Sequence, residues 1–146
     1  MTTPGNLTHT QKTGSDTTTD GIRIQADAQY MPADSDPESR QYLYAYRIVI
    51  TNTGNVPVRL RSRHWIIIDS DHRREDVHGE GVVGKTPRLA PGESFAYTSG
   101  CPLGTAWGTM EGSYQMERDD GRSFRAHIER FFLVPNAPRL STLSRS

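Results

Sequence analysis

The clearest structural pattern in the chain is Tyr42-Leu43-Tyr44-Ala45-Tyr46-Arg47-Ile48-Val49-Ile50-Thr51. Every second side chain is a tyrosine or an isoleucine, while the positions between them carry a mixed set of residues. Successive side chains of a β-strand point to opposite faces, and aromatic and β-branched residues favour a pleated surface. This stretch therefore predicts a strand whose tyrosine and isoleucine face is buried.

The same period-two pattern recurs on both sides of this strand, with turn residues between the repeats. It is present at residues 22–27, 58–69, 95–101, 110–116 and 124–128. Nowhere do apolar residues recur at helical spacing over ten or more positions. The sequence therefore predicts an all-β fold, an antiparallel β-sandwich of seven or eight strands.

Three local signals refine this prediction. Asn52-Thr53-Gly54-Asn55 carries turn chemistry and predicts a chain reversal between two strands. Residues 73–77 predict a short polar strand at a sheet edge. After Ile128 the apolar residues lose their alternation, and a β-bulge near Glu129-Arg130 would restore it.

Two polar segments flank the predicted strands. Residues 1–20 are rich in Thr, Ser, Gly and Asp, and they cannot bury enough apolar surface to offset the entropy of ordering. Residues 136–146 have a similar composition. We therefore expect a disordered N-terminal tail at 1–20, one sandwich domain at 21–135 and a flexible C-terminal tail at 136–146.

The balance of charge argues against nucleic-acid binding, and the lack of a long apolar run argues against membrane insertion. The 17 Lys and Arg residues are matched by 17 Asp and Glu residues, so the net positive field that draws proteins to nucleic acid is missing. No apolar run is long enough to span a membrane, so membrane insertion is not expected. The single cysteine and the absence of an apolar N-terminal run predict a cytoplasmic protein.

The string Gly79-Glu80-Gly81-Val82-Val83-Gly84 is a formal match to the GxGxxG dinucleotide-binding motif. That motif holds a pyrophosphate at the start of a helix, but Pro87, Pro91 and Gly92 prevent a helix here. Successive N–H groups and Lys85 could still form a nest for a small anion such as pyrophosphate. We favour the alternative that the glycines permit positive φ angles in a connection between strands, because the motif is weak evidence outside its strand–helix context.

A second candidate is the polar run around residue 75. His72, Asp76 and His78 would lie on one side of a strand, which a metal ion could exploit. However, their spacing matches no recognised zinc or calcium loop, and Arg73 and Arg74 intervene. Solvated charges at a sheet edge are the favoured interpretation, so the sequence predicts no metal site and no cofactor.

A third candidate is the row Arg59, Arg61 and Arg63 on one strand. Planar guanidinium groups could bind phosphate or an acidic partner. Stacking on the tyrosines of the preceding strand is the favoured interpretation, because the zero net charge gives no long-range support to nucleic-acid binding.

The sequence gives little support for catalysis. Ser99 and Cys101 are possible nucleophiles, but no spacing joins either of them to a histidine in a triad. Their alternation predicts that both point into the core, where a cysteine is usually inert. We therefore expect that the protein is not an enzyme.

Several linked motifs resemble those of the bacterial ApaG proteins. In chain order they are Arg63-His64-Trp65, Gly79 to Gly84, Leu89-Ala90-Pro91-Gly92-Glu93, Tyr97-Thr98-Ser99-Gly100, and Gly108-Thr109-Met110 through Gly112, Tyr114 and Met116. The resemblance covers about residues 22–135. One departure is Glu129, because the family usually has a proline after the isoleucine at this point.

The resemblance implies both a fold and a class of function. ApaG proteins resemble fibronectin type III and immunoglobulin-like sandwiches, and related domains in eukaryotic F-box and polymerase-interacting proteins look like interaction modules. In bacteria the family is associated with cobalt and magnesium resistance or efflux. The resemblance therefore implies a non-catalytic binding or protein-interaction module with an unidentified protein partner.

We expect this module to contact its partner through exposed strand edges and the aromatic surface around Trp65, and sheet extension could also give a homodimer. The alternatives are a binder or hydrolase of nucleotide polyphosphates or pyrophosphate that uses the glycine loop, and a direct binder of divalent metal. The residues expected to bind a ligand or partner are Gly79, Glu80, Gly81, Val82, Val83, Gly84, Lys85, Arg63 and Trp65.

Overall fold

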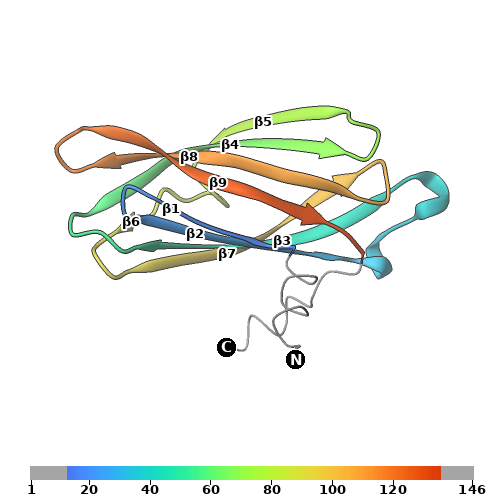
Figure 1. Cartoon of the computed structure of the whole chain (residues 1–146), viewed down its shortest axis with the longest axis horizontal. Helices are drawn as coiled ribbons and strands as arrows, with labels where there is room; N and C mark the ends of the chain where they lie inside the picture. The colour runs from blue at the N-terminus through green and yellow to red at the C-terminus, as the bar shows by residue number, and fades with distance from the viewer. Residues whose placement is uncertain (1–12, 136–146) are drawn as a thin grey trace, which may run out of the picture.

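The computed structural model describes residues 13–135 and contains two antiparallel β-sheets (Figure 1). The strands of this region are β1 (Ser15–Thr19), β2 (Ile22–Tyr30), β3 (Tyr42–Asn52), β4 (Val58–Asp69), β5 (Arg74–Glu80), β6 (Arg88–Leu89), β7 (Ser94–Leu103), β8 (Gly108–Arg118) and β9 (Ser123–Leu133). Two short 3-10 turns, η1 (Pro32–Asp34) and η2 (Pro37–Ser39), lie between β2 and β3. The prediction of an all-β, antiparallel sandwich is confirmed.

The order of strands differs from a simple series of hairpins. One sheet has the order β1-β2-β3-β7, and the other has the order β5-β4-β8-β9 with β6 paired to β4. The consecutive strands β3 and β4 therefore belong to different sheets, and the turn after Asn52 carries the chain across the sandwich. The expected stacking of β4 arginines on the tyrosines of a neighbouring strand is thus wrong, because the partners of β3 are β2 and β7.

Asn52 fixes this crossing between the sheets. Its side chain is only 1% exposed, and its Nδ2 donates to the carbonyl oxygens of Val56 (2.8 Å) and Leu89 (3.0 Å). Its Oδ1 accepts a hydrogen bond from the N–H of Gly54 (2.9 Å). A buried amide is tolerated in a core only when its donors and acceptors are satisfied. Asn52 therefore ties the turn to the strand pair β4–β6.

The strand β1 corrects the prediction that residues 1–20 are disordered. Residues 15–19 pair with residues 22–26, and a turn at Asp20-Gly21 with positive φ angles joins the two strands. Thr17 Oγ1 also donates to Glu129 Oε1 (2.6 Å). A threonine-rich strand held by hydrogen bonds has few apolar residues, which is why the composition did not reveal it. Residues 1–12 and 136–146 of the two expected tails lie outside the described residues.

The core lies between the facing sheets. Tyr44, Ile48 and Ile50 of β3 are fully buried, as the alternation in this strand predicts. Met110, Tyr114 and Met116 of β8 are buried from the opposite sheet, again with the expected parity. Tyr46 of β3 contacts Trp65 across the sandwich in an edge-to-face arrangement, with ring centroids 5.3 Å apart. Aromatic contacts of this kind contribute beyond the area that they bury.

Two β-bulges alter the alternation of side chains. Met110 pairs with Phe131 and Gly112 pairs with Ile128, so Glu129 and Arg130 lie opposite a single residue of β8. The predicted bulge at this point is confirmed. A second irregularity, between Leu60 and Ser62 of β4, was not predicted. A bulge moves the following side chains to the other face of the strand, and this one determines the orientation of Arg63 described below.

No helix within residues 13–135 has the length and apolar character needed to cross a membrane.

Candidate functional site

The two sides of the sandwich differ in how they are closed. On one side β9 runs beside β1 and β2, and the N–H of Phe132 donates to the carbonyl oxygen of Thr13 (2.9 Å) (Figure 1). On the other side β5 and β7 are the outermost strands of their sheets, and within residues 13–135 each pairs with a single strand. We call this second side the open side. An unpaired strand edge presents a row of N–H and C=O groups that can accept another strand.

A pocket of about 490 Å³ lies between the sheets on the open side. Residues of β3, β4, β5, β7 and β8 and of the glycine-rich loop form its wall. The lining includes Tyr46, Arg63, Trp65, Val77, Val83 and Cys101. Ligand pockets in proteins are commonly concave and largely apolar, with a few polar groups that give orientation. The wall of this pocket combines apolar side chains such as Trp65 and Val77 with the charged residues Arg63, Glu75 and Glu80.

Arg63 joins the pocket to the glycine-rich loop. Its Nη1 donates to the carbonyl oxygens of Glu80 (3.0 Å) and Gly81 (2.8 Å). Gly79 lies opposite Arg63 in the strand register, and a Cβ atom at this position would be 2.5 Å from the guanidinium carbon. The missing side chain of Gly79 thus makes room for Arg63. Among the described residues, Arg63 forms no ion pair with a carboxylate, although Glu75 and Glu80 line the same pocket, and its guanidinium hydrogen bonds go to backbone carbonyl oxygens.

Trp65 forms part of the pocket wall and is only 2% exposed. The ring is therefore not exposed on a sheet surface, because it packs inward against Tyr46, Tyr114 and Phe131. Its indole Nε1–H is buried and has no hydrogen-bond acceptor in the region that the structure describes. A buried donor without an acceptor costs about 1–3 kcal/mol and calls for an explanation.

Tyrosine hydroxyls extend the polar part of the pocket. Tyr46 and Tyr97 line it, and the hydroxyl of Tyr97 shares a hydrogen bond with that of Tyr114. Burial raises the pKa of all three tyrosines above the usual value. These groups are therefore neutral at physiological pH, and the charged residues of the pocket lining are Arg63, Glu75 and Glu80.

The glycine-rich loop is a tight turn between strands and not the start of a helix. Val82 and Lys85 exchange two backbone hydrogen bonds of 2.8 Å, and the residues between them, Val83 and Gly84, both have positive φ angles. This is the geometry of a type I′ turn. The N–H of Gly81 is also engaged, by the carbonyl oxygen of Arg61. Three donors of the alternative anion nest are therefore already used within the fold.

The structure brings together most of the residues that the sequence singled out. Arg63, Trp65, Glu80, Val82, Val83 and Gly84 line the pocket, and Gly79 and Gly81 hold Arg63 in place. Lys85 closes the turn but does not line the pocket. The pocket also contains residues that were not selected as site residues, chiefly Tyr46 and residues 99–102 of β7.

The expected row of three arginines is not preserved. Arg59 donates to the carbonyl oxygen of Thr86 and Arg61 pairs with Glu117, whereas Arg63 reaches the glycine-rich loop. The bulge between Leu60 and Ser62 breaks the alternation on which the prediction rested. A cooperative phosphate-binding surface of the three arginines is therefore not formed.

Ser99 and Cys101 point toward the interior, as their alternation predicts. Cys101 is 2% exposed, and burial raises the pKa of its thiol to about 12. A reactive cysteine needs a lowered pKa, because the thiolate is the nucleophile. Cys101 therefore has the environment of a structural residue.

Comparison with known proteins identifies the family. The ApaG domain matches residues 32–118. The chain belongs to the ApaG domain family. A protein named ApaG from Azoarcus sp. (strain BH72) is 56% identical over 113 residues, which cover 77% of this chain and 89% of that protein. ApaG of Dechloromonas aromatica (strain RCB) is 53% identical over 120 residues, which cover 82% of this chain and 94% of that protein.

A solved structure agrees with this assignment to the ApaG family. The crystal structure of a Bordetella pertussis protein named ApaA superposes with a TM-score of 0.76 at 47% sequence identity. The match covers 81% of this chain and 94% of that protein. The sandwich described above is thus the ApaG fold, and the resemblance inferred from the sequence motifs is confirmed.

Proposed function

We propose that the protein is a non-catalytic binding module that holds an extended segment of a partner protein on its open side. The observation that carries this proposal is the position of the pocket between two strand edges, β5 and β7, that have no further strand neighbour in the described region. A segment that pairs with a strand edge gains affinity from main-chain hydrogen bonds. Every second side chain of the segment would then face the interior, and one of them would enter the pocket.

Of the two edges, β7 is the better docking strand. It is ten residues long, and residues 99–102 of this strand line the pocket. The strand β5 carries the charged run Arg74, Glu75 and Asp76, and charged edges discourage strand addition. The partner segment is therefore placed beside β7, with its inward side chain directed toward Trp65.

The polar groups of the pocket suggest the chemistry of the segment. Arg63 has no carboxylate partner in the described part of the chain, and the Nε1–H of Trp65 has no acceptor there. A carboxylate beside the inserted apolar side chain would satisfy both needs, since guanidinium–carboxylate hydrogen bonds are among the strong ones. The proposed ligand is an extended segment with an apolar residue and an acidic residue two positions apart, because these two side chains face the same way.

The turn at the pocket contains a strained residue that supports a binding role. Val83 has a φ angle of 43°, which is rare for a β-branched side chain, and it is 52% exposed. Strained residues of this kind cost about 1–3 kcal/mol and cluster at binding sites. An exposed valine held in this conformation beside the pocket provides apolar surface for the inserted side chain.

The proposed partner-binding role bears on cation efflux, on catalysis and on the glycine-rich loop. The link to cobalt and magnesium resistance or efflux, which the family resemblance implies, would act through the bound partner. The raised pKa of Cys101 supports a role without catalysis, and a free cysteine suits the reducing cytoplasm. A pyrophosphate-binding role for the loop has less support, because the N–H groups of Gly81, Val82 and Lys85 are engaged.

The test uses peptides selected from a random displayed library on the wild-type protein. We expect selected peptides to carry an apolar and an acidic residue two positions apart. Arg63→Gln should weaken their binding about tenfold or more by loss of the charged pair. Isothermal titration with a synthetic selected peptide measures the effect. Arg59→Gln is the matched control, since Arg59 also donates to a backbone carbonyl but does not line the pocket.

The possible results separate the candidate functions. Equal affinity of the wild-type and Arg63→Gln proteins, or failure to select any peptide, would contradict the proposal. A parallel titration with inorganic pyrophosphate that shifted the backbone amides of residues 79–85 would favour the anion site instead. A homodimer that the selected peptide dissociates would identify the segment as one from a second copy of the chain.

A further inference from the structure

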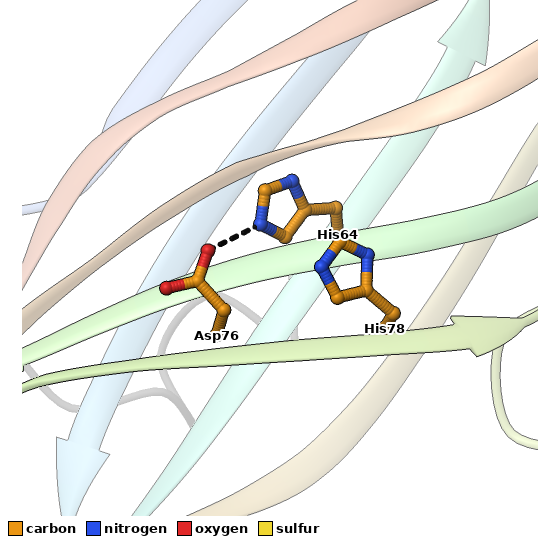
Figure 2. Close-up of side chains that lie close together, drawn as sticks. All are labelled: His64, Asp76 and His78. Carbon is orange, nitrogen blue, oxygen red and sulfur yellow. Dashed lines mark hydrogen bonds and ion pairs between the residues drawn. The ribbon is translucent and has the colours of Figure 1, made fainter.

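A group of three metal-binding side chains lies on the outer face of the β4–β5 pair, apart from the pocket lining. His64 of β4 and His78 of β5 are directly opposite each other in the register. Asp76 lies two positions before His78 and on the same face of β5. Figure 2 shows the Asp76 carboxylate directed toward the His64 ring, with the His78 ring beside it. One potential ligand atom from each residue lies within 4.8 Å of the other two. The group therefore arises from strand pairing and not from a short sequence motif.

We propose that His64, Asp76 and His78 bind one divalent transition-metal ion of the zinc class. Two imidazole nitrogens and one carboxylate oxygen are a ligand set suited to Zn²⁺, and water would complete a tetrahedral shell. Mg²⁺ prefers an octahedral shell of oxygen ligands and is not expected to bind. No part of the pocket or of the proposed peptide site takes part in this metal site.

The distances are close to those that a bound ion requires. His64 Nε2 is 2.7 Å from Asp76 Oδ2, and the two imidazole rings are stacked with centroids 4.1 Å apart. Ligand atoms of a tetrahedral zinc site lie about 3.3 Å from one another. Each imidazole binds a metal in its own ring plane, so the two rings must turn out of their stack to share one ion. The side chains of His64 and Asp76 are 30% and 33% exposed, which leaves them room to rotate.

A simple ion pair does not explain the whole group. The contact between His64 and Asp76 alone would be an ordinary cross-strand pair on a sheet surface. The His78 side chain, however, forms no hydrogen bond or ion pair within residues 13–135, although it stacks on His64. A bound metal ion would make His78 a ligand, because the ion accepts the lone pair of each neutral imidazole.

Arg74 sets the ionisation of the site and limits its affinity. Its Nε donates to Asp76 Oδ1 (2.7 Å) and its Nη2 to Asp76 Oδ2 (3.0 Å). The hydrogen bonds from Arg74 and then from His64 hold the pKa of Asp76 well below its usual value, so the ligand is a carboxylate at physiological pH. With a metal on Oδ2, Oδ1 keeps its bond to Arg74, as the outer-shell partners of metal sites commonly do. The guanidinium charge nevertheless repels the cation.

The test is titration of the untagged, full chain with Zn²⁺ and, separately, with Mg²⁺. We expect one Zn²⁺ ion per chain and no heat from Mg²⁺. His78→Asn and Asp76→Asn should each weaken zinc binding about tenfold or more, because each removes one of three ligands. Arg74→Gln should strengthen it several-fold, since it removes the repulsion and leaves the ligands in place.

His72→Asn is the matched control variant. His72 is exposed in the turn between β4 and β5 and is not one of the three clustered residues. Its replacement should leave the affinity unchanged, and nuclear magnetic resonance of the wild-type imidazole nitrogens should show shifts at His64 and His78 on adding Zn²⁺. Absence of zinc binding, an equal loss in His72→Asn, or unchanged affinity in His78→Asn with no imidazole shift would overturn the proposal.

Discussion

Replacing Gly112 by alanine is expected to destabilise the protein by about 3 kcal/mol or more, because the new methyl group has no space. Gly112 is buried in β8 and lies opposite Trp65 of β4. A Cβ atom at this position would overlap the carbonyl oxygen of His64, and it would lie 3.2 Å from the Cα of Trp65. The obstructing atoms belong to the backbone of the central strand pair, so no side-chain rotation can relieve the clash.

The control for this prediction is Gly100→Ala in β7. A Cβ atom there would lie 3.7 Å from Leu43 Cδ1 and 3.9 Å from the carbonyl oxygen of Tyr44, which are ordinary contacts. We expect Gly100→Ala to change the stability by less than about 1 kcal/mol. Urea unfolding followed by circular dichroism measures both variants. Equal stability of the two variants would show that β4 and β8 do not approach each other as described.

Trp65→Ala is expected to destabilise the protein by about 3–5 kcal/mol, the usual cost of removing a large aromatic side chain from a core. The indole packs against Tyr46, Tyr114 and Phe131, and these contacts connect the two sheets. Its removal would also enlarge the pocket and remove the wall against which the inserted side chain rests. We therefore expect loss of affinity for selected peptides under conditions in which the variant is still folded.

Trp65→Phe separates packing from the unpaired indole donor. Phenylalanine keeps an aromatic ring in the cluster but lacks the Nε1–H group, which has no acceptor in the described region. Removing an unpaired donor breaks no hydrogen bond, so the free energy of unfolding should fall by less than about 2 kcal/mol. Urea unfolding gives both values. A cost for Trp65→Phe as large as that of Trp65→Ala would mean that the donor is satisfied in solution.

The fold was largely predictable because its strands have one buried face and one exposed face. The alternation in β3 and β8 indicated which side chains enter the core, and the irregular spacing after Ile128 indicated the bulge at Glu129-Arg130. The pairing of strands was less predictable, because the alternation of apolar and polar residues shows which face of a strand is buried but not which strands lie beside it. The crossing of the chain between sheets after Asn52 depends on buried hydrogen bonds of that side chain, which no local pattern shows.

The candidate sites were only partly predictable for the same reason. The glycine string and Arg63 were recognised, but the bulge before Ser62, which directs Arg63 inward, has no signal in the sequence. The group of His64, Asp76 and His78 could not be predicted, because His64 is on β4 and the other two residues are on β5. His72 was considered instead, and it lies in the turn before β5 with a φ angle of 67°. Register across strands, which places His64 opposite His78, appears only in the structure.

The two proposals concern different faces of the same strand pair. The peptide site uses the inward face of β4 with Arg63 and Trp65, and the metal site uses the outward face with His64. Because neighbouring residues of a strand point in opposite directions, variants at the two sites should affect the two ligands separately. Arg63→Gln should therefore keep all three zinc ligands in place and should not weaken zinc binding, although Arg63 also borders the small pocket that His64 and His78 line.

The most direct test of the open side as the binding site is amide hydrogen exchange with a selected peptide bound. We expect added protection along β7, residues 94–103, because a partner strand would pair with its free edge. We expect no added protection along β1 and β9, which are already joined to each other. Protection that appears at β1 and β9, with β7 unchanged, would contradict the account.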